Sequence, residues 1–377
     1  MNKLIITDYK EKITTIEYCG QTAVDINLEK KSDFHLYDVF VGRVESIAKN
    51  INSAFISIGD GVKCFYQLNA EDKIKTGDVL PVQIVKEKSK SKDAECSINI
   101  SIPGEFVVVT EGLYSLGISS KFTDNNRKFD LQQLFDSTFS YDDNYSFILR
   151  TKSEKATDEE ILGEAYSHMK LIEELKSRAA HTPEHKKIFS GTAYYIDKIR
   201  DMKEACEIVT DDKAVYENIL SSFPDANVTF YEDELLPLSK LYKTETLIKE
   251  ASGRKVWLKC GGYIVIDETE AMTVIDVNTG KNDSKKNMEE TFFVTNLEAA
   301  REAARQIRLR NLSGIIIIDF IDMKKKSHMD EVVEFLKEAV FSDPVRTIVV
   351  DVTKLNLVEL TRKKMHMTLK EQLSASV

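Results

Sequence analysis

Two short apolar runs, each ending in an aspartate, lie between residues 270 and 323. They are Met272–Asp276 and Ile315–Asp319, and apolar runs of this length between turn residues are typical of buried strands. The segment between them predicts a helix, because its apolar residues recur at spacings of 4, 3, 4 and 3 along one face: Phe293, Leu297, Ala300, Ala304 and Ile307. The hydrophobic pattern therefore predicts a strand, a crossover helix and a second strand.

Strands joined by a crossover helix lie parallel and end at the same edge of their sheet, which is where open sheets bind ligands. Asp276 and Asp319 should therefore sit side by side at that edge. Two close carboxylates repel unless a cation lies between them, and Mg²⁺ takes few carboxylates with several waters. Asn278 would hold a carboxylate or a bound water in place. The alternative is that the aspartates cap loops or pair with nearby arginines.

The remaining pattern predicts further elements on both sides of this segment. Residues 1–33 predict a strand followed by a hairpin, which would join a later segment to make a stable sheet. Short strands separated by glycines over residues 39–98 fit a small five-stranded barrel. The other predicted elements are a helix over Asp158–Arg178, strands over Lys255–Lys259 and Gly262–Asp267, a helix over Glu331–Phe341, a strand over Arg346–Asp351 and a helix over Asn356–Gln372.

Composition excludes several classes of protein. At 377 residues and 42% apolar, the chain has room for two to four globular modules. It contains no stretch of 18 uncharged apolar residues and no signal-peptide core at its start, so we expect no membrane span. The five cysteines are odd in number and form no CxxC pair, which argues against a disulfide framework and a zinc knuckle. This cysteine usage indicates a cytoplasmic protein.

The net charge of −10 is unusual for a protein that binds nucleic acid, although the electrostatic footprint of such a protein is local. Four basic clusters occur, at residues 86–92, 305–310, 324–326 and 362–364. Each is more often a solvated face than an RNA contact. The cluster at 324–326 lies close to the predicted aspartate edge, which favours a functional role for that cluster.

Three segments around the two aspartates resemble the catalytic domain of the ribonuclease E/G family: IVIDETEAMTVIDVNTG, EETFFVTNLEAAREAARQIRLRNLSGIIIIDFIDM and LVELTRKK. The resemblance implies a Mg²⁺-dependent endoribonuclease, with Mn²⁺ as the alternative ion, that hydrolyses single-stranded RNA to 5′-phosphate and 3′-hydroxyl ends. It makes Asp276, Asn278 and Asp319 catalytic, with the metal on the two aspartates. It also matches Arg346 to a basic residue of the active site. The alternative is a non-catalytic RNA-binding or rRNA-processing adaptor on the same fold.

The predicted barrel is similar to the OB-fold RNA-binding module of the same family, through the segments VGRV, SAFISIG and GDVLPVQIVKE. The resemblance implies that Phe55 and Phe65, on consecutive strands, stack against RNA bases. Lys92 matches a third contact residue of the module. The alternative for the two phenylalanines is a place in the barrel core.

Residues 99–187 resemble the family's sensor for an RNA 5′-monophosphate. Arg150 and Thr151 match the pair that holds the phosphate by a guanidinium fork and a hydroxyl. Gly104 and Val108 match the flanking contacts. The sensor segment departs from the family pattern at residues 120 and 121, which are serine and lysine where two arginines are common.

The resemblance implies a multidomain fold that combines α+β and α/β parts. The expected parts are an RNase H-like scaffold over residues 1–33 and 188–250, an inserted OB-fold RNA-binding barrel over 34–98, a 5′-sensor region over 99–187 and a DNase I-like catalytic α/β domain over 251–377. Family members carry a CxxC zinc link after LVELTRKK, and no cysteine follows Cys260 here. We therefore expect no zinc and no zinc-linked tetramer, but a homodimer or a monomer.

Overall fold

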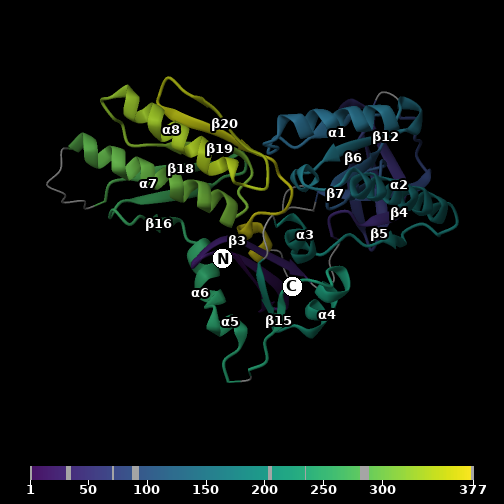
Figure 1. Cartoon of the computed structure of the whole chain (residues 1–377), viewed down its shortest axis with the longest axis horizontal. Helices are drawn as coiled ribbons and strands as arrows, with labels where there is room; N and C mark the ends of the chain where they lie inside the picture. Colours follow the sequence, from purple (N-terminus) through teal and green to yellow (C-terminus); the bar gives the residue numbers. More distant parts are fainter. Residues whose placement is uncertain are drawn as a thin grey trace. The chain divides into compact units, whose positions relative to one another are not determined.

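The computed structural model describes residues 2–30, 35–69, 72–86, 93–202, 206–233, 235–280 and 288–374. The chain forms two compact units (Figure 1), namely Met1–Asp33 with Glu204–Val377, and Phe34–Lys203. Both units combine helices with sheets, so the expected mixed α+β multidomain fold is confirmed. Every helix among the described residues is too short or too polar to cross a lipid bilayer.

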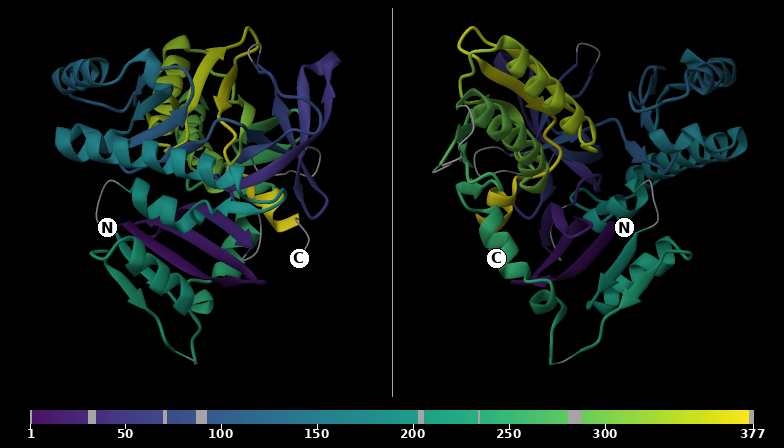
Figure 2. Two further views of the ribbon diagram at one scale, coloured as in Figure 1. Left: turned by 90° about the vertical axis from the view of Figure 1, so that its right-hand side faces the viewer. Right: turned by 60° about the vertical axis from the view of Figure 1, so that its left-hand side comes forward.

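A five-stranded sheet begins the first unit, with strand order β15-β14-β1-β2-β3. β1, β14 and β15 run parallel to one another, whereas β2 is antiparallel to both of its neighbours. The strands are β1 (Asn2–Tyr9), β2 (Lys12–Cys19), β3 (Thr22–Lys30), β14 (Glu207–Thr210) and β15 (Val228–Phe230). The strand and hairpin predicted for residues 1–33 are confirmed, and both views of Figure 2 show these purple strands side by side.

The turn between β1 and β2 consists of two residues with left-handed backbone, Lys10 (φ 52°) and Glu11 (φ 62°). Positive φ at both central residues is the geometry of a hairpin turn whose twist matches that of its strands. The Asp8 carboxylate accepts the backbone N–H of Glu11 at 3.2 Å, which stabilises a conformation that side chains other than glycine adopt reluctantly. The first hairpin therefore closes without a glycine.

Helices from later in the chain pack against the first sheet. They are α4 (Lys213–Ser222), α5 (Leu238–Leu241), α6 (Thr244–Ala251) and α9 (Leu369–Ser374). The core beside this sheet brings Ile5 and Ile26 of the strands together with Leu309 at the end of α7 (Met288–Leu309) and Leu369 of α9. The N-terminal strands and the C-terminal segment consequently share one hydrophobic core.

A six-stranded sheet forms the rest of the first unit, in the order β16-β17-β18-β19-β21-β20. The strands are β16 (Lys255–Trp257), β17 (Tyr263–Glu268), β18 (Met272–Asn278), β19 (Gly314–Asp319), β20 (Thr347–Val352) and β21 (Leu357–Arg362). α7 (Met288–Leu309) and α8 (Lys326–Phe341) lie side by side on one face of this sheet (Figure 1). β18 and β19 pair in parallel across α7, so the predicted strand, crossover helix and strand are confirmed.

The helix predicted over Asn356–Gln372 is wrong. β21 (Leu357–Arg362) occupies the first part of that segment and is inserted between β19 and β20, antiparallel to both. Val358, Leu360 and Arg362 are buried, and the residues between them are not, which is the period of two expected of a strand. Hydrogen bonding to a partner on each side outweighs the local helical preference of this segment, and α9 begins only at Leu369.

A closed five-stranded barrel lies at the start of the second unit, as predicted for residues 39–98, and it fits an OB-like fold. Its strands are β4 (Val39–Ala48), β5 (Ser53–Gly59), β6 (Val62–Gln67), β7 (Val79–Lys86) and β8 (Ala94–Ser97). β4 pairs with both β5 and β7 and so closes the ring. A Cβ atom on Gly42 would lie 2.7 Å from methyl groups of Ile56 and Val82, so the closure needs glycine at this position.

A four-stranded sheet with three helices makes up the remainder of the second unit. The strands are β9 (Ser101–Pro103), β10 (Val107–Glu111), β11 (Leu116–Ile118) and β12 (Tyr145–Leu149), and β13 (Lys187–Phe189) joins the barrel at β4. The helices are α1 (Asn125–Thr138), α2 (Asp158–Ala180) and α3 (Tyr194–Asp201), with short 3-10 turns at Lys49–Ile51, Tyr141–Asp143 and Thr151–Glu154. α2 confirms the predicted Asp158–Arg178 helix and packs its apolar face on β9 and β10.

The basic cluster at residues 305–310 turns inward and is neither a solvated face nor an RNA contact. Arg305 donates to the backbone carbonyl of Ala23 at 2.7 Å, and Arg308 forms an ion pair with Glu17. Arg310 is only 3% exposed and donates to the Gly253 carbonyl at 2.7 Å. Arg305 and Arg308 therefore tie α7 to the first sheet, and Arg310, the residue after this helix, is tied to the segment that follows α6.

Arg362, from the basic cluster at 362–364, is buried as well. Its guanidinium donates to the Asp343 carboxylate at 2.7 Å and 3.3 Å, to the Asn311 side chain at 2.6 Å and to the Leu312 carbonyl at 3.1 Å. Both partners of the ion pair are nearly inaccessible to water, with side-chain exposures of 3% and 5%. Arg362 is therefore a structural residue of the six-stranded sheet.

Candidate functional site

Asp276 and Asp319 are direct partners in the parallel register between β18 and β19. Asp319 is the last residue of β19, and Asp276 lies two residues before the end of β18. Neighbouring strands lie roughly 5 Å apart, so the two carboxylates leave adjacent points of the same sheet edge. The sequence prediction that the crossover places these aspartates side by side is confirmed.

Both aspartates project from the face of the sheet that the helices do not cover. Ile275 and Val277 of β18, and Ile316 and Ile318 of β19, are buried under α7 and α8. Since successive side chains of a strand point to opposite faces, Asp276 and Asp319 point away from that core, and both are exposed. Because side chains alternate between the two faces of each strand, both carboxylates lie on the same open surface and contact solvent.

Asn278 is held against the first of these carboxylates. Its side-chain Nδ2 donates to Asp276 Oδ2 at 2.7 Å, two residues away on the same face of β18. This hydrogen bond takes up one carboxylate oxygen and limits the rotation of the Asp276 side chain. The sequence interpretation of Asn278 as a residue that holds a carboxylate agrees with this contact.

The site carries a concentrated negative charge. Partial burial, followed by the charges of Asp276 and Asp322, raises the pKa of the Asp319 carboxyl above its ordinary value. Asp322 is itself held by the Asn356 side chain, which donates to it at 3.2 Å. A cation at this edge would relieve the repulsion between the carboxylates.

The loop that follows Asp319 is held by Glu289 of α7. The Glu289 carboxylate accepts the backbone N–H groups of Lys324 and Lys325 at 3.0 Å and 3.1 Å. The hydrogen bond from Lys324 is the main cause of a lowered Glu289 pKa, with partial desolvation opposing it. The crossover helix therefore fixes the loop beyond the second aspartate.

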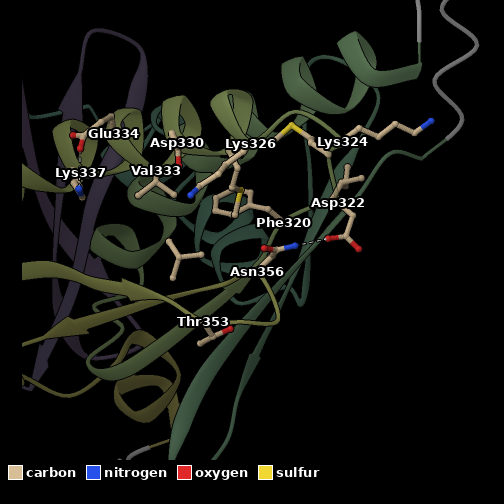
Figure 3. Close-up of a pocket in the computed structure, with 14 residues that line it drawn as sticks. Phe320, Asp322, Lys324, Lys326, Asp330, Val333, Glu334, Lys337, Thr353 and Asn356 are labelled. Atoms are coloured by element: carbon tan, nitrogen blue, oxygen red, sulfur yellow. Dashed lines mark hydrogen bonds and ion pairs between the residues drawn. The ribbon is translucent and has the colours of Figure 1, made fainter.

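A cleft of about 680 Å³ begins one residue past Asp319 (Figure 3). It lies among the loop after β19, the start of α8 and the turn between β20 and β21. The residues lining it are Phe320, Ile321, Asp322, Met323, Lys324, Lys326, Met329, Asp330, Val333, Glu334, Lys337, Val352, Thr353 and Asn356. Figure 3 shows the Asn356 amide directed at Asp322, while the Lys324 side chain extends away from the cleft.

The side chains at the edge fit a hard divalent cation. No group of three or more His, Cys, Asp or Glu side chains suited to a metal ion occurs within the described residues. Mg²⁺ does not need such a group, because it is bound through one or two carboxylates and keeps several waters. The exposure of Asp276 and Asp319 leaves room for those waters. The hydrogen bond from Asn278 holds the Asp276 carboxylate in one orientation.

Arg346 does not reach this edge. It is exposed and directly precedes Thr347, the first residue of β20. Thr347 is the register partner of Arg362 on β21, and Arg362 is the register partner of Gly314 at the start of β19. Asp319 ends β19 five residues after Gly314, which at about 3.3 Å per residue places Thr347 roughly 17 Å along the sheet from the aspartates, and Arg346 one residue further away. Within this unit, Arg346 therefore lies away from Asp276 and Asp319, beside which the family resemblance had placed it.

Phe55 and Phe65 are direct partners on β5 and β6 of the barrel. Their ring centroids are 6.0 Å apart, with planes at 73°. The barrel core is built from the alternate positions of these strands, such as Ile56 and Cys64, and both phenylalanines are half-buried outside it. The rings therefore lie on the outer surface of the barrel, which argues against the core alternative. Lys92 lies outside the described residues.

Arg150 and Gly104 meet at the end of the four-stranded sheet. Arg150 Nη1 donates to the Gly104 carbonyl at 2.8 Å, and Nη2 donates to the carboxylate of Asp201 at the end of α3. The other arm of the guanidinium is thus already paired with a carboxylate. Sequence reasoning missed Asp201, because it is separated from Arg150 by 51 positions and only the fold brings them together.

Thr151 and Val108 lie close to this arginine along the chain and the sheet. The Thr151 hydroxyl is 3.0 Å from the hydroxyl of Ser119, and Val108 pairs with Ile148 on β12. Gly104 is packed so tightly that an added Cβ would lie 2.4 Å from the Glu164 carboxylate. Glu164, which sequence reasoning also missed, accepts the N–H groups of three successive residues, Glu105, Phe106 and Val107, at 2.7 Å, 2.7 Å and 2.8 Å.

Known proteins resemble this chain over most of its length. The sequence profile of the Ribonuclease E/G family matches residues 101–365. Ribonuclease G of Salmonella typhimurium is 32% identical over 94% of this chain and 72% of its own length, and Ribonuclease G of Haemophilus influenzae is 33% identical over the same shares. Ribonuclease E of Synechocystis is 30% identical over 89% of this chain and 53% of its own length.

Proposed function

Because the chain belongs to the Ribonuclease E/G family, we propose that it is an endoribonuclease of RNA processing that cleaves single-stranded RNA at the Asp276–Asp319 edge. One observation carries the proposal. The two aspartates are register partners on parallel strands, exposed on the open face, with Asn278 bonded to one of them. Paired carboxylates in this arrangement serve phosphodiester hydrolysis by holding a divalent cation.

The roles of the residues follow from their contacts. A Mg²⁺ or Mn²⁺ ion held by Asp276 and Asp319 would supply an activated water and stabilise charge on the scissile phosphate, giving 5′-phosphate and 3′-hydroxyl ends. Asn278 orients Asp276 through its 2.7 Å hydrogen bond. Asp322 adds negative charge beside Asp319, which raises the pKa of the Asp319 carboxyl and would attract a cation to this edge. Glu289 fixes the loop between these acids and α8.

The strand orders support a finer assignment of the domains. A sheet with two antiparallel strand pairs followed by two parallel ones, β3-β2-β1-β14-β15, fits an RNase H-like scaffold. The six-stranded sheet that follows would be the DNase I-like catalytic domain, over residues 251–377. The OB-fold would occupy 34–98 and the 5′-sensor region 99–187. Segment 188–250 would complete the scaffold, although the compact units divide between residues 203 and 204.

The barrel and the region after it would bind the RNA. Phe55 and Phe65 present two rings on one outer surface, which suits stacking by unpaired bases. Gly104, Val108, Arg150 and Thr151 would form the 5′-monophosphate sensor. There the RNA 5′-phosphate has to compete with the Asp201 carboxylate for the guanidinium of Arg150. The preference for RNA with a 5′-monophosphate over RNA with another 5′ end should therefore be weak.

Replacing Phe55 or Phe65 by alanine is expected to weaken binding of single-stranded RNA by roughly 1–3 kcal/mol, because each substitution removes a stacking surface. The melting temperature should change little, since neither ring belongs to the barrel core. Fluorescence anisotropy with a labelled oligonucleotide measures the affinity, and thermal unfolding provides the control. Unchanged affinity together with a lowered melting temperature would contradict the stacking role and indicate that the two rings contribute to the barrel core.

Cleavage of a fluorescent single-stranded RNA by the purified protein tests the proposed function most directly. We expect cleavage with Mg²⁺ or Mn²⁺, no cleavage with EDTA, and recovery when Mg²⁺ is restored. The products should carry 5′-phosphate and 3′-hydroxyl ends. Binding of RNA without cleavage under all of these conditions would favour the alternative, a non-catalytic RNA-binding or rRNA-processing adaptor.

Three further expectations remain part of the proposal. All five cysteines are free thiols, and none forms a CxxC pair, so we propose that the chain holds no structural zinc of the family's zinc-link type. A homodimer or a monomer is then expected in place of a zinc-linked tetramer. We also propose a cytoplasmic location, on the grounds of the unpaired cysteines.

A further inference from the structure

An aromatic cluster lies on the edge strand of the six-stranded sheet. The indole of Trp257 on β16 is 65% exposed, and its ring centroid lies 5.3 Å from that of Tyr263 on β17, with planes at 64°. The ammonium group of Lys255 lies 3.9 Å from the centroid of Trp257 and 3.5 Å from that of Tyr263. Two aromatic faces and one cation are thus gathered within a few ångströms at the surface.

This cluster occupies the same face of the sheet as the two aspartates. Trp257 is paired with Tyr263, and Tyr263 with Asn278, so these three side chains form one row across β16, β17 and β18. The neighbouring row contains Lys255, Val265 and Asp276. With strands about 4.8 Å apart, the tryptophan and the lysine begin roughly 10 Å from the candidate catalytic residues.

The orientation of Trp257 is not explained by packing of the core. Its neighbour on β16, Val256, packs against the core on the helix side, whereas the indole points to the open face and keeps most of its surface in water. Leaving a large aromatic surface exposed forgoes the stabilisation that its burial would contribute. Such exposure beside a functional edge is typical of a binding surface.

We propose that Trp257, Tyr263 and Lys255 form a subsite that receives one nucleotide of the RNA strand next to the scissile phosphate. A base would stack on the exposed face of the indole, and Lys255 would face the phosphate attached to that nucleotide. The inference rests on the proposed function, because it assigns the open face to the same RNA that is cleaved at the Asp276–Asp319 edge.

The chemistry of the cluster selects a nucleic acid as its occupant. Aromatic faces bind bases without regard to sequence, and the ammonium group of Lys255 between them offers a positive charge to a phosphate near the acidic Asp276–Asp319 edge. The row from Trp257 through Tyr263 to Asn278 also makes the cluster continuous with the candidate active site. Both features fit a single RNA strand lying across the face.

Tryptophan fluorescence can test the subsite directly, because Trp257 is the only tryptophan in the 377 residues. The wild-type protein is titrated with a single-stranded RNA oligonucleotide in EDTA, which prevents cleavage. We expect the emission to be quenched as RNA binds, and to remain quenched at saturating RNA in a Phe55→Ala/Phe65→Ala variant. Quenching in that variant would show that the signal does not depend on the barrel surface.

Substitutions then separate stacking from structure. Trp257→Leu is expected to weaken the affinity for labelled RNA about five-fold to a hundred-fold, whereas Trp257→Phe, which keeps an aromatic face, should lose much less. Val350→Ala removes another exposed apolar side chain from the opposite edge strand of the same sheet and should leave the affinity unchanged. Thermal unfolding of all three variants checks that the fold is intact.

The possible outcomes keep this inference distinct from the proposed function. RNA cleavage with unquenched fluorescence and wild-type affinity in Trp257→Leu would overturn the subsite and leave the ribonuclease assignment standing. Quenching and a selective loss of affinity without any cleavage would support the subsite and contradict the assignment. Emission that changes with protein concentration in the absence of RNA would identify the face as a contact between copies of the chain, and would also overturn the subsite.

Discussion

Replacing Asp276 or Asp319 by asparagine is expected to reduce the rate of RNA cleavage by roughly 10²- to 10⁴-fold. The change removes one of the two charges that would hold the cation, and with it several kcal/mol of stabilisation of the transition state. Single-turnover cleavage of a labelled RNA in Mg²⁺ measures the effect. RNA binding in EDTA should be preserved, since the aromatic surfaces remain in place.

The folded state should tolerate both substitutions. Each aspartate is exposed, and the charge of Asp276 helps to raise the pKa of Asp319, so losing one charge relieves repulsion. We therefore expect an unchanged or slightly higher melting temperature. Asp351→Asn, which removes an exposed carboxylate from β20 of the same sheet, serves as the matched control and should cleave normally. Wild-type cleavage rates in both Asp276→Asn and Asp319→Asn would contradict the assignment of these two residues to the active site.

Arg362→Met is expected to lower the free energy of unfolding by about 3–5 kcal/mol. The substitution preserves much of the side-chain volume but leaves the Asp343 carboxylate buried without its partner, which costs far more than an exposed ion pair contributes. It also removes the donors to Asn311 and Leu312. Denaturant unfolding monitored by circular dichroism measures the change.

Two further variants identify the source of this loss. Adding Asp343→Asn to Arg362→Met removes the uncompensated charge and should recover part of the stability. The amide oxygen of asparagine can still accept the hydrogen bond from the Val345 N–H, and its NH2 group can donate to the Thr347 hydroxyl. Lys363→Met changes an exposed neighbour and should stay within about 0.5 kcal/mol of wild type. Equal stability in Arg362→Met and Lys363→Met would show that the buried ion pair is not needed.

The sequence by itself determined the pairing of the two aspartates. β18, α7 and β19 are consecutive in the chain, the two strands are short apolar runs, the helix has a clear hydrophobic period, and a crossover of this length allows one arrangement of the strands. The position of Asp276 beside Asp319 follows from these local facts. The hairpin of residues 1–33 and the closed barrel were predictable for the same reason, since each consists of strands close together in the chain.

Only the tertiary structure decided which residues meet across long separations. β21 enters the sheet between β19 and β20, although it follows β20 in the chain, and its segment resembles a helix when no partner strands are considered. The basic clusters around Arg308 and Arg362 look solvated in the sequence, and their partners Glu17 and Asp343 lie 291 and 19 positions away. Trp257 comes into line with Asn278 only because β17 lies between them. Local periodicity specifies which face of an element is apolar, whereas strand neighbours and buried charge pairs depend on the packing of the whole unit.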